Sequence, residues 1–148
     1  MKRFVLLLSL AMSSLALSVP AAAADPNAAE SVVQTQLNAY NARDIDAFLT
    51  TYSDDVEVYD FPDKLRFKGK PAMRARYTRV FGDQSLHATV SKRIAMDNTV
   101  IDHEHVRLLF PDGPGTLDAV AIYDVREGKI AKVTFIMGTR ILDSAAKP

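Results

Sequence analysis

Four consecutive ionisable residues, Asp102, His103, Glu104 and His105, lie in the middle of a segment that otherwise has the apolar character of a β-strand. Successive side chains of a strand point to opposite faces, so the two acids share one face and the two histidines share the other. One of these pairs must look toward the interior of the protein. A buried imidazole pair is suited to proton transfer.

The apolar neighbours leave both orientations open. Those that alternate with the acids are Val100, Val106, Leu108 and Phe110, and those that alternate with the histidines are Ile101 and Leu109. If the histidines face inward, His103 is a candidate acid/base catalyst and His105 a pocket residue. A metal site would then need a third ligand from His87 or Asp60, and we predict neither a metal nor another cofactor. In the alternative, these side chains face solvent or pair across strands with Arg93, Arg107 or Lys92.

Asp60 is a second candidate for chemistry. It follows a short alternating strand and lies between Tyr59 and Phe61, which are candidate pocket residues. At the mouth of a pocket, a carboxylate so placed would be partly desolvated, which raises its pKa toward the range of a useful general base. The alternative is an aspartate that forms the turn before Pro62.

The spacing of apolar residues predicts three helices and a long sheet. A helix is expected over 28–40, and Asp44 caps a second helix whose buried stripe extends to Tyr52. Short strands around 56–59 and 65–67 follow, and Pro71 opens a third helix. Four β runs, 86–96, 99–110, 116–125 and 129–138, are separated by hairpin residues and predict an antiparallel meander.

These elements predict a single α+β domain over 25–148. Its three N-terminal helices would pack on a strongly curved, mainly antiparallel β-sheet that leaves an open cone. Residues 1–24 have the order of a cleaved signal peptide, with Lys2 and Arg3, an apolar stretch and small residues. We therefore expect a periplasmic or secreted protein without a permanent membrane anchor. Without Lys2 and Arg3 the chain has about 16 basic and 18 acidic residues, a balance that argues against nucleic-acid binding.

Several local motifs, in this order of elements, carry a family resemblance. They are NARDIDAF at 41–48, YSDDV at 52–56, FKGK at 67–70 and GKI at 128–130. The sequence resembles the nuclear transport factor two-like superfamily, and within it the SnoaL-like and ketosteroid-isomerase-like proteins. The resemblance implies a cone-shaped, cystatin-like α+β barrel, a pocket for a small hydrophobic molecule, and a homodimer formed through the outer face of the sheet.

The same resemblance implies roles for particular residues. Asp60 matches the general base of the isomerase pattern. The position of its oxyanion tyrosine falls at Gln36, and that of its second acid falls at Ala121, so the hydrogen-bond donors of a steroid isomerase are missing there. Tyr40, one helical turn from Gln36, could supply a phenol instead. The other predicted pocket residues are Tyr77, Phe135 and Met137.

Two functions are compatible with these features. The first is an isomerase- or lyase-type enzyme without an organic cofactor, in which Asp60 moves a proton on a small hydrophobic carbonyl compound with a histidine as its partner. The second is a noncatalytic periplasmic module that binds an apolar ligand or dimerises. The second is favoured by the absence of cysteine, of a glycine-rich phosphate loop and of a Gly-x-Ser-x-Gly motif.

Overall fold

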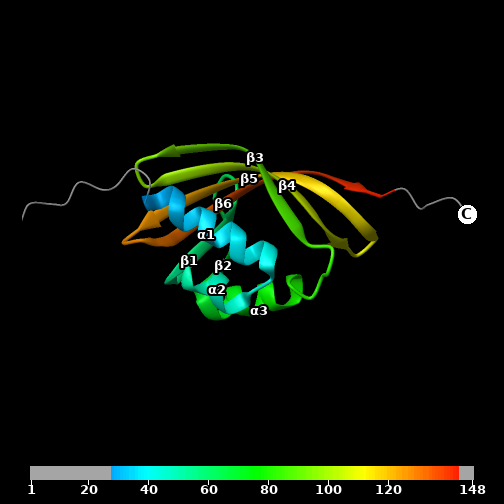
Figure 1. Ribbon diagram of the computed structural model, residues 1–148, viewed down its shortest axis with the longest axis horizontal. Coiled ribbons are helices and arrows are strands. Elements are labelled where there is room, and N and C mark those ends of the chain that lie inside the picture. The colour runs from blue at the N-terminus through cyan, green and yellow to red at the C-terminus, as the bar shows by residue number, and fades with distance from the viewer. Residues whose placement is uncertain (1–27, 144–148) are drawn as a thin grey trace, which may run out of the picture.

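The computed structural model describes residues 28–143, in which helices cover one side of a six-stranded sheet (Figure 1). The elements in chain order are α1 (Ala28–Ala42), α2 (Ile45–Thr50), β1 (Tyr52–Asp60), β2 (Lys64–Lys68), α3 (Lys70–Val80), β3 (His87–Met96), β4 (Thr99–Phe110), β5 (Gly113–Arg126) and β6 (Lys129–Leu142). The predicted α+β class is confirmed. Within 28–143, however, two helices and not three precede the sheet, because α3 follows β2. The predicted signal segment, 1–24, lies outside the described residues.

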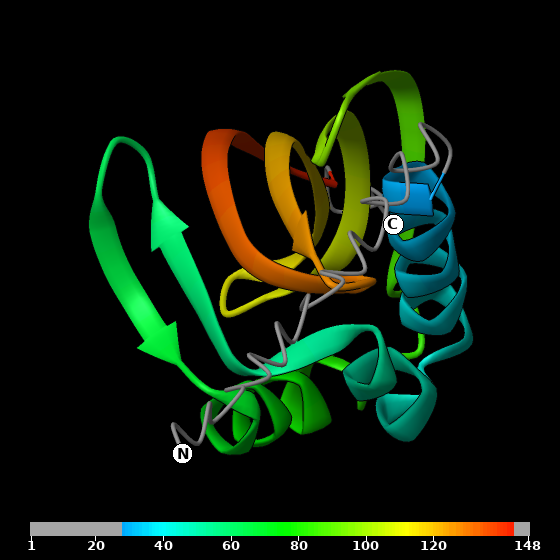
Figure 2. The same cartoon turned by 90° about the vertical axis from the view of Figure 1, so that its left-hand side faces the viewer.

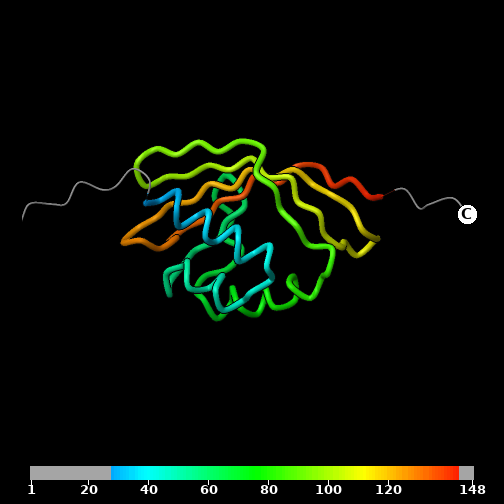
Figure 3. Tube along the Cα trace, in the orientation of Figure 1, coloured from blue at the N-terminus to red at the C-terminus, as the bar shows by residue number. Residues whose placement is uncertain are grey.

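The sheet has the strand order β2-β1-β6-β5-β4-β3. The strands β3 to β6 form the predicted antiparallel meander, and β1 pairs with β6 in parallel. The strands bend along their length, as the Cα trace in Figure 3 shows, and Figure 2 shows α1 on one side of the curled sheet and the β1–β2 hairpin on the other. No helix within 28–143 is both long and apolar enough to cross a membrane.

The second helix is shorter than its apolar pattern predicts. Asp44 caps it by accepting hydrogen bonds from the backbone N–H groups of Asp46 and Ala47. The helix ends at Thr50, and the N–H of Ile130 donates to the carbonyl oxygen of Thr51 over 2.9 Å as the pairing with β6 begins. Tyr52 therefore starts β1 instead of belonging to the helix, as the sequence had suggested.

One bend of the sheet depends on a glycine. The register between β5 and β6 shifts between Leu117 and Ala119, where the single residue Asp118 lies opposite Gly138 and Thr139 in a bulge of β6. A Cβ atom at Gly138 would lie 2.6 Å from the carbonyl oxygen of Asp118, so no larger residue fits there without a shift of the backbone. This close approach brings Ala119 and Met137, which flank the bulge, into register on the two strands.

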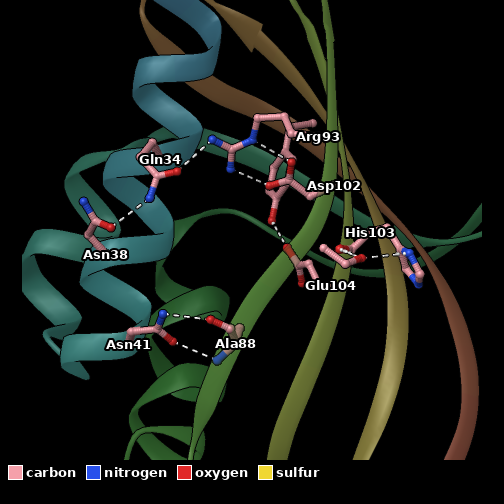
Figure 4. Close-up of polar contacts among 10 residues, drawn as sticks. Gln34, Asn38, Asn41, Ala88, Arg93, Asp102, His103 and Glu104 are labelled. Atoms are coloured by element: carbon pink, nitrogen blue, oxygen red, sulfur yellow. Dashed lines mark hydrogen bonds and ion pairs between the residues drawn. The ribbon is translucent and has the colours of Figure 1, made fainter.

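The concave face is packed by aromatic side chains and tied to α1. Tyr40, Phe48, Tyr77 and Phe81 stack in tilted and edge-to-face pairs, with ring centroids of Phe48 and Tyr77 4.6 Å apart. The side-chain amide of Asn41 donates to the carbonyl oxygen of Ala88 over 2.9 Å and accepts from its N–H over 2.8 Å (Figure 4). These bonds hold the end of α1 against β3.

Candidate active site

The acids of β4 face the interior and the histidines face outward. Asp102 and Glu104 are 1% and 8% exposed, in line with Val100 and Val106. His103 lies by the hydroxyl of Ser91, with Nδ1 and Oγ 3.0 Å apart, and His105 lies by Asp118, both on the exposed face. The predictions of His103 as a catalytic residue and of His105 as a pocket residue are therefore wrong. On β4, the face that carries the two acids also carries more apolar residues than the other face, and this face packs against the core.

Asp102 forms an ion pair with an arginine from the neighbouring strand. The Arg93 guanidinium donates from Nε and Nη2 to the two carboxylate oxygens of Asp102 over 2.7 and 2.6 Å (Figure 4). Its Nη1 donates to the side-chain oxygen of Gln34 on α1, over 2.8 Å. This bidentate pair satisfies the buried charge of Asp102, so Asp102 is part of the framework and not free for proton transfer.

Glu104 lies beside this pair and has no basic partner of its own among residues 28–143. The Tyr123 hydroxyl donates to Glu104 Oε1 over 2.9 Å. Burial raises the pKa of Glu104 to about 7, the nearby charge of Asp102 also raises it, and the Tyr123 hydrogen bond and the Arg93 charge oppose the rise. A carboxyl group with this pKa can both accept and donate a proton near neutral pH.

Glu104 opens onto a cavity of about 110 Å³ inside the curled sheet. Its polar lining comes from four elements besides β4, and consists of Gln36, Tyr40, Arg66, Arg76, Tyr77 and Tyr123. Most of the remaining wall is apolar, and includes Leu37, Val80, Val106, Leu108, Leu117 and Phe135. The cavity reaches the surface near Met137, which is 44% exposed. An apolar wall with a few convergent polar groups is typical of a small-molecule site.

Two phenols in this cavity keep their protons. Burial raises the pKa of Tyr77 to about 12 and that of Tyr40 well above its usual value. Neither hydroxyl has a hydrogen-bond partner within the described part of the chain, although Tyr123 and Tyr59 each have one. The hydroxyls of Tyr40 and Tyr77 are therefore donors available to a bound molecule.

The structure divides the other predicted pocket residues into two groups. Those that line the cavity are Gln36, Tyr40, Tyr77, Phe135 and Met137. Tyr59, Phe61 and Ala121 do not line it. The Tyr59 hydroxyl donates to Glu57 over 2.8 Å, Phe61 is 60% exposed, and Ala121 is fully buried in the core beside Asp102.

Asp60 lies outside the cavity lining and is paired with an arginine that belongs to it. Arg66 Nε donates to Asp60 Oδ1 over 2.6 Å, and Arg66 Nη2 contacts the same oxygen. The hydrogen bond from Arg66 lowers the pKa of Asp60, whereas a base at a pocket mouth was expected to have a raised one. The predicted raised pKa is therefore wrong, and the ion pair disfavours Asp60 as a general base.

The sequence reasoning gave no role to Glu104, Tyr123, Arg66 or Arg76, all of which line the cavity. For Glu104 a signal was present, since four apolar residues alternate with the acids and only two with the histidines. No such signal marks the two arginines, which come from β2 and α3 and meet only in the folded chain. Within 28–143, no three His, Cys, Asp or Glu side chains group as a metal site would require.

Replacing Glu104 by Gln should change how stability depends on pH. The pKa of Glu104 is about 7 when folded and near its ordinary 4.5 when unfolded, so the folded state binds the extra proton between these values. Stability of the wild type is then lost as the pH rises from 4.5 through 7, by about 3 kcal/mol in all. The stability of Glu104→Gln should not fall in this way as the pH rises, because its side chain does not titrate.

Denaturant unfolding at pH 4.5 and pH 8 measures the difference between the two proteins. The advantage of Glu104→Gln over the wild type should grow by about 3 kcal/mol between the two pH values. An advantage that stays constant would mean that Glu104 titrates normally. Glu127→Gln, on an exposed turn, is the matched control and should follow the wild type.

Comparison with known proteins agrees with this fold. The sequence model of the SnoaL-like domain matches residues 33–133, which is most of the described chain. The chain belongs to the SnoaL-like domain family. No curated protein matches this SnoaL-like chain.

Three solved structures illustrate its fold. An uncharacterised cystatin-fold protein from Novosphingobium aromaticivorans is 23% identical with a TM-score of 0.67, over 73% of this chain and 97% of that one. An epoxide hydrolase of M. tuberculosis, described as LEH-like, is 16% identical with a TM-score of 0.66, over 75% and 83%. SalBIII, an epoxide hydrolase/cyclase-like enzyme of pyran ring formation in salinomycin, is 17% identical with a TM-score of 0.69, over 78% and 95%. At these identities the likeness shows the fold alone.

Proposed function

We propose that this SnoaL-like protein catalyses proton transfer on a small, largely apolar carbonyl compound, in an isomerase- or lyase-type reaction, with Glu104 as the acid/base. The observation that carries the proposal is a buried carboxyl without a cationic partner, facing a cavity of about 110 Å³. Perturbed carboxyls in apolar clefts are typical of catalytic sites. Two of the similar structures are described as enzymes, the LEH-like epoxide hydrolase and the epoxide hydrolase/cyclase-like SalBIII, which supports an enzymatic role.

The arrangement supports a two-step mechanism. Ionised Glu104 removes a proton from the carbon next to the carbonyl group. The electron pair of that C–H bond forms a carbon–carbon double bond, and the π pair of the carbonyl group moves onto its oxygen. The resulting oxyanion accepts hydrogen bonds from the hydroxyls of Tyr40 and Tyr77, which remain protonated. Protonated Glu104 then returns the proton to another carbon of the same molecule or to a leaving group, which regenerates the carboxylate.

The surroundings of Glu104 suit this cycle. The Tyr123 hydroxyl fixes one carboxylate oxygen and leaves the other for the substrate. The ion pair of Arg93 and Asp102 beside it satisfies the second buried acid, and Glu104 is the carboxyl that lines the cavity. The apolar wall excludes water, which strengthens the effect of both phenol donors.

The turnover of 5-nitrobenzisoxazole by the purified protein tests the proposal without knowledge of the natural substrate. A base that removes the C3 proton of this probe breaks its N–O bond and releases a coloured phenolate. We expect saturable turnover at pH 8 that exceeds the rate in buffer and is kept by Glu127→Gln. Binding of the probe without turnover would contradict the proposal and would favour a noncatalytic ligand-binding protein.

We also propose export and self-association for this protein. The signal-like order of residues 1–24 supports a periplasmic or secreted location. Apolar side chains of β3 and β6 that remain exposed, such as Ile94 and Ile136, support a homodimer. Sedimentation of the secreted protein and the N-terminal sequence of its mature form test both points. A monomer, or a retained Met1, would contradict them.

A further inference from the structure

Two guanidinium groups from different elements line the same cavity. Arg66 on β2 is held by Asp60, and its Cζ lies 5.4 Å from the centroid of the Phe135 ring. Arg76 on α3 lines the cavity as well and forms no ion pair with any residue in 28–143. Arg66 is therefore fixed in place by its neighbours, whereas Arg76 has its donors free.

The charges in the cavity lining are separated. Arg66, Arg76 and Glu104 are its only charged members among the described residues. The sheet order puts three strands between β2, which carries Arg66, and β4, which carries Glu104. Tyr77 is near both kinds of charge, since both arginines lower its pKa and Glu104 raises it. One side of the cavity is thus cationic and the other holds the proton-transfer group.

The cationic side has more positive than negative charge. The carboxylate of Asp60 is close enough to both guanidinium groups for their charges to lower its pKa, and it already pairs with Nε and Nη2 of Arg66. A guanidinium group binds a carboxylate through parallel N–H donors, and such charge-assisted bonds are stronger than neutral ones. Nη1 of Arg66 and the nitrogens of Arg76 have no partner within 28–143 and remain for such a group.

We propose that the ligand of this cavity is a small organic carboxylate, whose acid group binds Arg76 and Arg66 and whose apolar body extends toward Glu104. This inference rests on the proposed function in one respect, namely that the cavity is the substrate site. It adds the substrate class: a compound with a carboxylate at one end and the reacting carbon at the other. The ion pair with Asp60 then serves to position Arg66.

Binding of phenylacetate and phenylacetamide, measured by titration calorimetry, tests the inference. The two probes have nearly the same shape and differ in the charge of the terminal group. We expect phenylacetate to bind about tenfold more tightly than the amide. Arg76→Met should reduce this preference severalfold, because Nη1 of Arg66 alone then remains to bind the acid group, and should weaken phenylacetate binding more than binding of the amide. Arg79→Met, on the same helix but outside the cavity, is the matched control and should keep the preference.

Equal affinity for the two probes would overturn the inference, and so would a preference that is undiminished in Arg76→Met or a failure of phenylacetate to bind. These results are distinguishable from failure of the proposed function, because they do not depend on turnover. Glu104→Gln should still prefer phenylacetate. If the wild type prefers phenylacetate but does not turn over 5-nitrobenzisoxazole, the cavity is a carboxylate site and the proposed catalytic function fails. If the wild type turns over 5-nitrobenzisoxazole but binds the two probes equally, the proposed function is supported and the carboxylate inference is overturned.

Discussion

Glu104→Gln should lower the turnover of 5-nitrobenzisoxazole by about 100- to 10,000-fold, which is the contribution expected of a positioned general base. Gln has nearly the shape of Glu and can still accept the Tyr123 hydrogen bond, so the cavity should keep its form. It cannot accept a proton at any pH of interest. The kcat of the variant measured at pH 8, where wild-type Glu104 is mainly ionised, gives the size of the effect.

The loss must be separated from unfolding and from a role of Asp60. Glu104→Gln should be at least as stable as the wild type at pH 8, because the buried charge is removed. Asp60→Asn discriminates the alternative base: if Asp60 moved the proton, its variant would lose turnover and Glu104→Gln would keep it. That pattern would refute the assignment of Glu104.

Arg93→Ala should destabilise the protein by about 3–5 kcal/mol, because it leaves the Asp102 carboxylate buried without its partner. Asp102 is 1% exposed, and both of its oxygens accept from Arg93. The substitution also removes the bond from Arg93 to Gln34 that joins β3 to α1. Urea unfolding at pH 7 measures the change in the free energy of unfolding.

Arg107→Ala provides the control for this prediction. Arg107 is on the paired strand β4, and its ion pair with Asp143 is exposed to solvent at both ends. Exposed ion pairs contribute little to stability, so the loss should be much smaller than for Arg93→Ala. Equal losses in the two variants would mean that the pair of Arg93 and Asp102 has no special structural role.

Much of the fold could be predicted from the sequence because its signals are local. Two-residue turns between long alternating runs, at 97–98, 111–112 and 127–128, define the meander, and Asp44 marks the start of α2. The residue at which α2 ends could not be predicted from such local signals. Tyr52 fits the apolar stripe of a helix, but the parallel pairing of β1 with β6 is a contact between segments far apart in the sequence.

The site was less predictable, since its chemistry depends on partners that the sequence does not place. In the sequence, Asp60 has no evident partner. In the structure, Arg66 is the unpaired residue at the irregularity between β1 and β2, and it forms an ion pair with Asp60. Glu104 looked like one of four equivalent ionisable residues. Only the structure shows that Asp102 has Arg93 as a partner whereas Glu104 has a tyrosine, and this difference gives the two acids different roles.

The pH dependence of kcat/KM for 5-nitrobenzisoxazole tests the central claim most directly, because it reports the ionisation of the base in the free enzyme. If Glu104 is the base, kcat/KM should rise with pH and level off above an apparent pKa of about 7, the value that burial gives its carboxyl group. A profile that levels off near the ordinary pKa of a carboxyl group, 4.5, would assign proton transfer to a solvated acid and contradict the role of Glu104.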